Sequence, residues 1–245
     1  MSEPTHTEQS LREAADNPYV KAFYWLSDEH DPRSYLGGAS CFAVRSGAKL
    51  FGVTAEHAIR EFERKTVIGT MARFGNHRID PIERIIARSE HWDVATFELT
   101  PSDVNKMGIE PLRWPPLTPT EERGVAVIGF LLDPGRVEVI PNGLVFDRLS
   151  NLLVATRIFP DSIEVEIDAN ELERPAHWSS LTEIPRGFSG GPMLTVVEGA
   201  PMLRPFMLGG VVTNFLPTGS DRGHFRVVPA AACMLPDGSL VQGES

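Results

Sequence analysis

Residues 39–45 (ASCFAVR) and 49–55 (KLFGVTA) are two short apolar runs separated by turn residues. Runs of the same kind, rich in Val, Ile, Phe and Thr, recur on both sides at 65–74, 82–88, 93–99, 125–132, 136–140, 143–149, 152–159, 162–168, 192–197, 205–215 and 224–230. Several short strands at regular spacing indicate an all-β protein. The chain lacks the alternation of strand and helix patterns that a parallel sheet with crossover helices needs.

A polar, proline-rich stretch, residues 98–124, divides the runs into two groups of five or six strands and is predicted to be a linker. Two six-stranded antiparallel barrels of the Greek-key type fit this division. A short helix is expected over residues 8–16, which are good helix formers. The expected organisation is an N-terminal extension (1–34), a first β-barrel (35–110), a linker (111–123), a second β-barrel (124–230) and a C-terminal tail (231–245).

The charge balance excludes several kinds of partner. The 245 residues include 23 Lys and Arg against 33 Asp and Glu, a net charge of −10, and no segment concentrates basic residues. Such a surface repels phosphate backbones and anionic lipids, so we expect no nucleic-acid and no membrane partner. No uncharged run reaches membrane-helix length, and the acidic N-terminus differs from a secretory signal. These observations predict a cytoplasmic protein.

Cysteine and histidine usage argues against metal sites and disulfides. The two cysteines, Cys41 and Cys233, are not part of a CxxC motif, so we expect buried free thiols in a reducing compartment. Four histidines, His6, His30, His77 and His177, lack metal-ligand spacing. No cofactor is expected.

Three segments carry residue types that together hydrolyse acyl bonds. In chain order they contain a histidine, an aspartate and a serine: VTAEHAI (53–59) with His57, HWDVATFEL (91–99) with Asp93, and RGFSGGPML (186–194) with Ser189. A serine hydroxyl is a weak nucleophile and needs an adjacent base, which a third group orients. Each residue alone is more often structural. All three in this order on an all-β background predict a catalytic triad.

The segment GFSGG (187–191) also matches the GxSxG nucleophile elbow of α/β-hydrolases. That fold places the acid and the histidine after the serine. His224 is the only histidine after Ser189, and no βα units precede the serine, so we set this alternative aside.

The surroundings of the three residues resemble trypsin-like serine peptidases of the chymotrypsin-fold superfamily, of the bacterial, high-temperature-requirement type without a PDZ domain. The resemblance covers about residues 36–230. It rests on TAEHA (54–58), WDVATFEL (92–99) and GFSGGPML (187–194), and on two strand segments, VAVIGF (125–130) and LGGVVTNF (208–215).

The resemblance implies a serine endopeptidase acting on a protein or peptide substrate. His57 would be the general base, Asp93 its orienting group and Ser189 the nucleophile. The backbone N–H groups of Gly187 and Ser189 would form the oxyanion hole. Four further residues would bind substrate: Glu183, Thr213, Asn214 and Phe215. A hydroxyl at Thr213 would support the triad aspartate.

Two departures from the family concern activation and redox state. Phe188 stands where secreted relatives carry the aspartate that pairs with a newly cut N-terminus, so zymogen activation by cleavage is not expected. Another control of this loop, including a regulatory protein partner, stays open. Ala58 replaces a half-cystine, which leaves Cys41 without a disulfide partner.

Other departures concern charge near the site. Glu56 is expected to be solvated, the alternative being a carboxylate that raises the pKa of His57. Trp92 is expected to pack and His91 to lie at the surface. Glu183 at the base of the S1 pocket would favour Lys or Arg, unless Arg186 neutralises it and leaves room for a small apolar side chain.

Two other functions remain as hypotheses. The double barrel could be a catalytically silent binding or scaffold module, against which the complete triad argues. A viral-type processing protease of the same fold usually carries cysteine as its nucleophile, which Ser189 disfavours.

Overall fold

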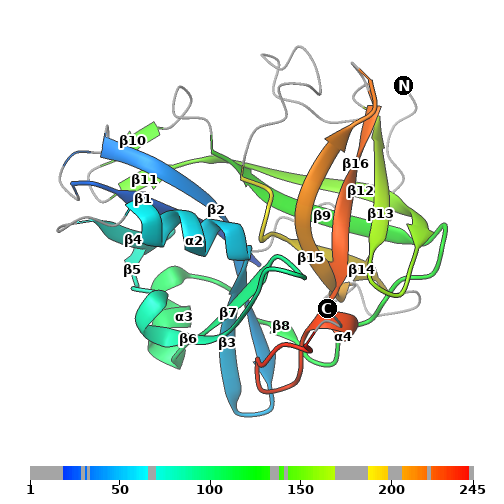
Figure 1. Ribbon diagram of the computed structural model, residues 1–245, viewed down its shortest axis with the longest axis horizontal. Coiled ribbons are helices and arrows are strands. Elements are labelled where there is room, and N and C mark those ends of the chain that lie inside the picture. The colour runs from blue at the N-terminus through cyan, green and yellow to red at the C-terminus, as the bar shows by residue number, and fades with distance from the viewer. Residues whose placement is uncertain are drawn as a thin grey trace.

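The computed structural model describes residues 19–28, 31, 34–65, 70–132, 138–140, 143–168, 187–197, 206–219 and 222–242. Figure 1 shows two β-rich halves side by side, the N-terminal half in blue to green and the C-terminal half in green to orange. The described chain is mostly strand, as the recurring apolar runs predict. The helix expected over residues 8–16 lies outside the described residues.

The N-terminal half is one eight-stranded sheet. Its strands are β1 (Val20–Leu26), β2 (Tyr35–Ser46), β3 (Lys49–Thr54), β4 (Met71–Phe74), β5 (His77–Arg78), β6 (Ile85–Ser89), β7 (Val94–Glu98) and β8 (Leu112–Arg113). The order is β5-β4-β1-β2-β3-β7-β6, and β8 pairs with β2 in parallel. Among the described residues this order has two open ends, β5 and β6, so the closed first barrel that we expected is not confirmed.

The C-terminal half is a closed six-stranded barrel in the order β12-β13-β16-β15-β14-β9. Its strands are β9 (Gly124–Leu131), β12 (Asp147–Ile158), β13 (Ile163–Asp168), β14 (Pro192–Val196), β15 (Phe206–Pro217) and β16 (Arg222–Pro229). All ladders in it are antiparallel. A separate hairpin, β10 (Glu138–Ile140) with β11 (Gly143–Val145), precedes β12.

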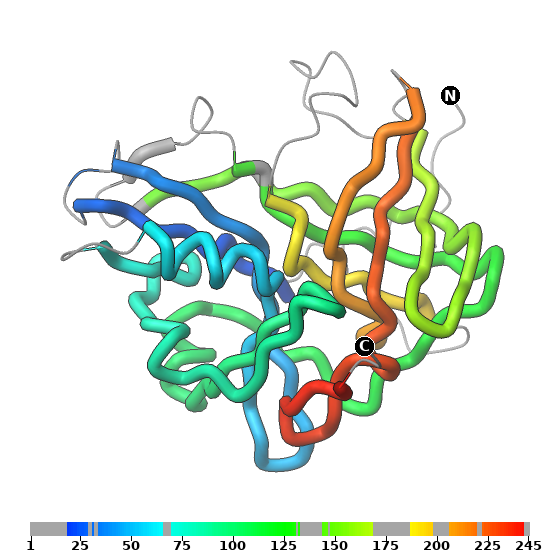
Figure 2. The backbone as a smooth tube through the Cα atoms, in the orientation of Figure 1, coloured from blue at the N-terminus to red at the C-terminus, as the bar shows by residue number. Residues whose placement is uncertain are grey.

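Two segments differ from the predicted domain boundaries. The first sheet begins within the predicted N-terminal extension, because the apolar run of β1 pairs with both β2 and β4. Residues 231–242 also belong to the folded structure. Helix α4 (Ala230–Cys233) is followed by a Met234–Leu240 bridge, and the Thr96 hydroxyl donates to the Gly238 carbonyl at 2.6 Å. In Figure 2 this red segment returns to the N-terminal half.

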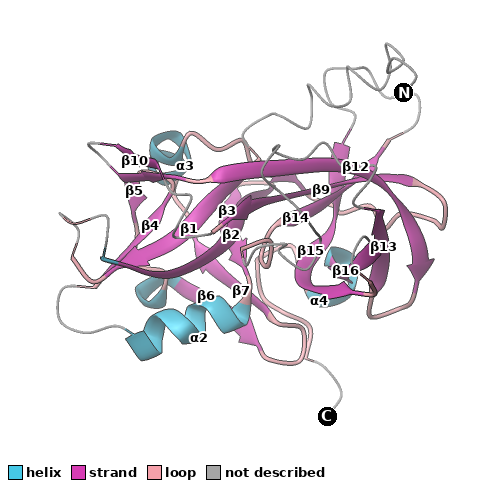
Figure 3. Ribbon diagram, turned by 90° about the horizontal axis from the view of Figure 1, so that it is seen from above, coloured by secondary structure: helices cyan, strands magenta, loops and turns pink. Residues whose placement is uncertain are grey.

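Three helical elements lie in the N-terminal half: α2 (Glu56–Lys65), the 3-10 helix η2 (Ile82–Arg84) and α3 (Pro101–Met107). In Figure 3, α2 lies on one side of the sheet. Helix α3 occupies part of the stretch that we predicted to be a linker. Thr100 and Asp103 form a capping box, Pro101 begins the helix and Gly108 ends it at φ 59°. These signals are local and could have been recognised in the sequence.

Four apolar clusters hold the fold together; the smallest lies around Tyr24 and Phe146, and the other three are larger. One fills the sheet side, around Phe23, Trp25 and Phe97, and another fills the barrel, around Phe188 and Phe225. The third joins the two halves, with fully buried residues from both: Phe42, Val53, Ile128, Leu194 and Leu208. Because burial of apolar area stabilises a fold by about 25 cal/mol per Å², this shared cluster keeps the two halves in a defined relative position. The three segments with His57, Asp93 and Ser189 meet beside it.

Both cysteines are buried and free, as predicted. Burial raises the pKa of the Cys41 thiol far above its ordinary value and that of Cys233 to about 12. Neither thiol therefore has the character of a reactive thiolate. Over the described residues, no helix combines the length and apolar character needed to cross a bilayer.

Candidate active site

His57 is the second residue of α2, directly after β3. The start of this helix leaves backbone N–H groups without intrahelical partners, and Asp93 accepts from two of them. The Glu56 N–H donates to the Asp93 carbonyl oxygen at 3.2 Å, and the His57 N–H donates to Asp93 Oδ1 at 2.9 Å. The aspartate thus ties the helix start to the turn between β6 and β7.

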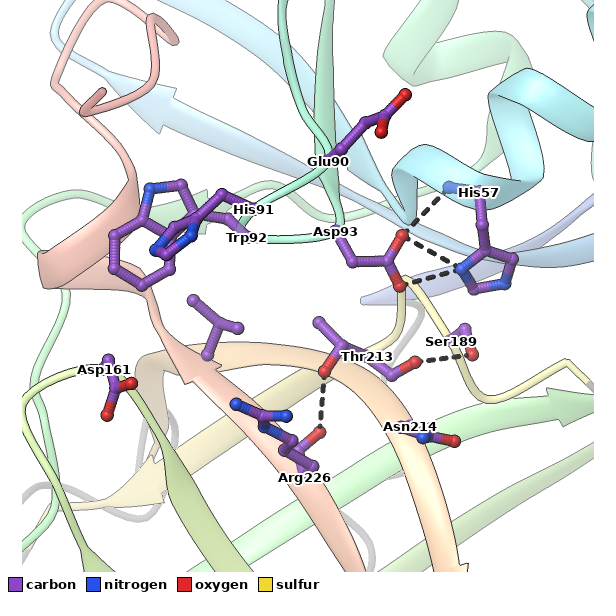
Figure 4. Close-up of a pocket in the computed structure, with 11 residues that line it drawn as sticks. His57, Glu90, His91, Trp92, Asp93, Asp161, Ser189, Thr213, Asn214 and Arg226 are labelled. Atoms are coloured by element: carbon purple, nitrogen blue, oxygen red, sulfur yellow. Dashed lines mark hydrogen bonds and ion pairs between the residues drawn. The ribbon is translucent and has the colours of Figure 1, made fainter. Parts of the chain in front are cut away.

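Asp93 occupies this position in a left-handed backbone conformation, with φ 52°. Few residues other than glycine adopt it, although aspartate is among the more tolerant. Strained backbone of this kind is characteristic of functional sites. The turn directs the Asp93 carboxylate at His57, and Figure 4 shows the two side chains facing each other.

The imidazole and the carboxylate form a close pair. His57 Nδ1 lies 2.8 Å from Asp93 Oδ2 and 3.0 Å from Oδ1. The pair is partly open to solvent, with side-chain exposures of 43% for His57 and 29% for Asp93. The hydrogen bond to Asp93 is the main cause that raises the pKa of His57, while desolvation by burial opposes it. The charges of Asp93, Glu61 and Glu56 raise this pKa further.

Ser189 lies on a tight loop that precedes β14. The loop has left-handed backbone at Gly187 (φ 128°) and at Gly190 (φ 82°), conformations that residues other than glycine rarely adopt. A Cβ atom at Gly187 would lie 2.5 Å from the Phe130 carbonyl oxygen. The glycines of the sequence motif are therefore required by the backbone path itself.

The serine hydroxyl is not hydrogen-bonded to the imidazole. Ser189 Oγ donates to the Thr213 carbonyl at 3.1 Å, and it has no hydrogen bond to His57 (Figure 4). Both residues nevertheless line the same two clefts, of about 470 and 560 Å³. Contacts between a nucleophile and its base are often long or misdirected before substrate binds. A rotation of Ser189 about χ1 redirects its hydroxyl without moving the backbone.

Three of the four predicted substrate-binding residues line the two clefts. Thr213 and Asn214 line the smaller cleft together with Trp92, and Phe215 lines the larger one with Gly187. The Thr213 hydroxyl donates to the Arg226 carbonyl at 3.2 Å. This hydrogen bond joins β15, which carries Thr213, to the neighbouring strand β16. The hydroxyl makes no hydrogen bond to Asp93, although the resemblance implied one. Glu183 lies outside the described residues.

The comparisons with known proteins support the fold. No protein-family model and no curated protein sequence matches this chain. Among solved structures, the Rv3671c protease from M. tuberculosis, in its active form, aligns over 94% of this chain and 85% of that chain, with 15% identity and a TM-score of 0.53. The fold is chymotrypsin-like. A structure from work on the Sesbania mosaic virus VPg protein aligns with 11% identity over 87% of each chain and a TM-score of 0.47.

Within the chymotrypsin-like fold, Phe188 takes a buried position. Its ring lies against Phe225, with centroids 5.1 Å apart, and it is 4% exposed. Gly129 makes room for it, since a Cβ there would lie 2.6 Å from the Phe188 ring. The loop is therefore anchored to the barrel by ring packing.

Glu56 departs from our expectation, because it is buried and not solvated. Its side chain is 2% exposed, and Arg88 donates to Oε1 at 2.7 Å. Arg88 also donates to Glu63 at 2.6 Å, and Arg60 lies 3.6 Å from Glu56 Oε2. The basic partner comes from β6, 32 residues away in sequence, so local sequence context could not predict it. The network joins the helix that carries His57 to the strand that leads to Asp93.

The two residues before Asp93 lie where we expected them. The Trp92 indole packs beside the shared apolar cluster and donates to the Val241 carbonyl at 2.8 Å. His91 is exposed and lies against the Trp92 ring. In the described part of the chain, no group of three or more acidic, histidine or cysteine side chains could hold a metal ion.

Proposed function

We propose that this protein is a serine endopeptidase that hydrolyses peptide bonds through His57, Asp93 and Ser189. The observation that carries the proposal is the close His57–Asp93 pair, at 2.8 Å, in the same cleft as a serine on a strained glycine loop. The chymotrypsin-like fold supports it, because in this fold the site lies between the two halves.

In the first half-reaction, Ser189 Oγ attacks the substrate carbonyl carbon while its proton passes to His57 Nε2. Asp93 accepts the Nδ1–H of His57, which leaves Nε2 free as the base and stabilises the imidazolium that forms. The oxygen of the tetrahedral intermediate is held by the N–H groups of Gly187 and Ser189. His57 then protonates the leaving amine, the C–N bond breaks and an acyl-enzyme remains.

In the second half-reaction, water attacks the ester carbonyl and gives a proton to His57 Nε2. A second tetrahedral intermediate forms in the same oxyanion hole. When the C–O bond to Ser189 breaks, the proton returns from His57 to Ser189 Oγ. The carboxylic acid product leaves, and the enzyme is regenerated with no net change in its protons.

We expect a fluorophosphonate probe to label wild-type protein at Ser189, because a base-activated serine beside an oxyanion hole reacts with such reagents far faster than other hydroxyls. The measurement is the mass of intact protein and of the labelled peptide over time. Ser189→Ala should abolish labelling, and His57→Ala should slow it by at least about 100-fold.

Labelling that persists undiminished in His57→Ala would contradict the triad. A wild-type protein that stays unlabelled would favour the silent binding module. A peptide-library cleavage profile of the wild type beside Ser189→Ala tests peptidase activity directly and reports the preferred residue before the cut.

The pH dependence provides a separate prediction. Only the neutral imidazole can accept the serine proton, and the Asp93 hydrogen bond raises the pKa of His57. The acid limb of kcat/KM should therefore have its midpoint above the ordinary histidine value of about 6.5. Removing one contributing charge, in Glu61→Gln, should move that midpoint to lower pH. A wild-type midpoint below the ordinary value would contradict the assignment of His57 as the base.

A further inference from the structure

Ser40 lies in β2 and is fully buried between the sheet and the loop that carries Ser189. Its hydroxyl has two partners from the barrel half. Oγ donates to the Gly187 carbonyl at 2.6 Å and accepts from the Phe130 N–H at 2.9 Å. The side chain thus connects the first sheet, strand β9 and the glycine loop through a single atom.

The Ser40 backbone contacts the same loop. Its N–H donates to the Ser189 carbonyl at 2.9 Å, and its own carbonyl accepts from the Thr54 hydroxyl at 2.8 Å. The loop carbonyls on both sides of Phe188 are therefore held by one residue of the other half. Thr54, at the end of β3, holds that residue in turn.

These contacts restrain the backbone next to the two N–H groups that would bind an oxyanion. The Gly187 carbonyl accepts from Ser40, and Gly187 itself has the positive φ of 128° that a glycine allows. Because peptide groups are planar, holding the Gly187 carbonyl fixes the Gly187–Phe188 peptide, which lies between the peptides that carry the Gly187 and Ser189 N–H groups. The buried Phe188 ring anchors the loop to the barrel, but apolar packing has no preferred direction and cannot orient a peptide group.

We propose that Ser40 is a positioning residue that keeps the Gly187–Ser189 backbone in the conformation that binds an oxyanion. The inference rests on the proposed function and extends it to a residue on the opposite half of the molecule. Without the hydroxyl, the buried Gly187 carbonyl would lose its donor and the part-buried Phe130 N–H would lose its acceptor. The loop could then recover a hydrogen bond only by rotating, which would turn donors away from the oxyanion.

The test is Ser40→Ala, with fluorophosphonate labelling and peptide hydrolysis as readouts. We expect kcat and the acylation rate to fall together by about 10- to 100-fold, below the loss for deleting a whole oxyanion donor. KM should change little, because ground-state substrate does not use the hole. The affinity of a peptide aldehyde, which forms a tetrahedral adduct, should fall by the same factor as kcat.

A matched control removes a different buried hydroxyl. Thr195, on β14, donates to the Leu117 carbonyl at 2.6 Å, the same distance as the Ser40–Gly187 bond. Thr195→Val should lower the urea midpoint without changing the acylation rate. If Ser40→Ala does not fold, Ser40→Cys, a weaker donor, replaces it with a smaller loss expected in the same direction.

Folded Ser40→Ala or Ser40→Cys that is acylated at the wild-type rate would overturn this inference alone. The same holds if Thr195→Val lowers the acylation rate as much as the Ser40 variant does, since the effect would then follow general stability. A wild-type protein that is not labelled would overturn the proposed function and this inference with it.

Discussion

Asp93→Asn should lower kcat by about 10⁴-fold with little change in KM, the effect that this exchange has in a His-Asp-Ser triad. Asp93 accepts from the His57 backbone N–H and from Nδ1. An asparagine can keep its oxygen on the backbone N–H, which places its NH₂ group against Nδ1. The imidazole then carries its proton on Nε2 and cannot accept the serine proton.

Active-site titration and single-turnover acylation check this result on folded protein. Glu98→Gln is a matched control, because Glu98 is an exposed carboxylate on β7, the strand that follows Asp93. It removes the same charge and should leave kcat unchanged. Asp93→Asn with kcat within about tenfold of wild type would be incompatible with an orienting role for Asp93.

Gly190→Ala should be the most destabilising single change in the loop, with a loss of about 4 kcal/mol or more in the free energy of unfolding. Its φ of 82° already disfavours any side chain, and the new Cβ would meet three groups of the other half. These are the Ser40 carbonyl oxygen, the Ala55 nitrogen at 2.6 Å and the Thr54 hydroxyl at 2.7 Å. Two of the three are backbone atoms and cannot move independently.

Urea unfolding followed by tryptophan fluorescence measures the effect. Gly219→Ala is the control, because nothing lies within 4 Å of a Cβ at that position. It should stay within about 0.5 kcal/mol of wild type. A Gly190→Ala protein with a wild-type urea midpoint would show that the two halves do not approach as closely as described.

Local sequence patterns were sufficient for the strand content, including the strands of the second barrel. Runs such as VAVIGFLL and PFMLGGVVTNF carry their own β signal, and they form β9 and β15. Whether the first sheet closes into a barrel was not predictable from these runs. Closure depends on whether β5 and β6 reach each other, which is a long-range pairing that strand propensity does not encode.

Some of the missed elements left a signal. The apolar run VKAFYWL is β1, and TPSD begins α3 with a capping box. Helix α2 left a weaker signal in the sequence, because it has few apolar residues and its charged residues form ion pairs with β6.

The sequence by itself determined which residues form the candidate site. His57, Asp93 and Ser189 could be named from short motifs, because each needs particular neighbours: a helix start, a turn and a pair of glycines. Only the tertiary structure decided how these groups are held. Ser40 reaches Gly187 across 147 residues of sequence, and Arg88 reaches Glu56 across 32. Such contacts arise when the two halves pack together, and their partners are chosen by burial and hydrogen-bond satisfaction in three dimensions rather than by proximity along the chain.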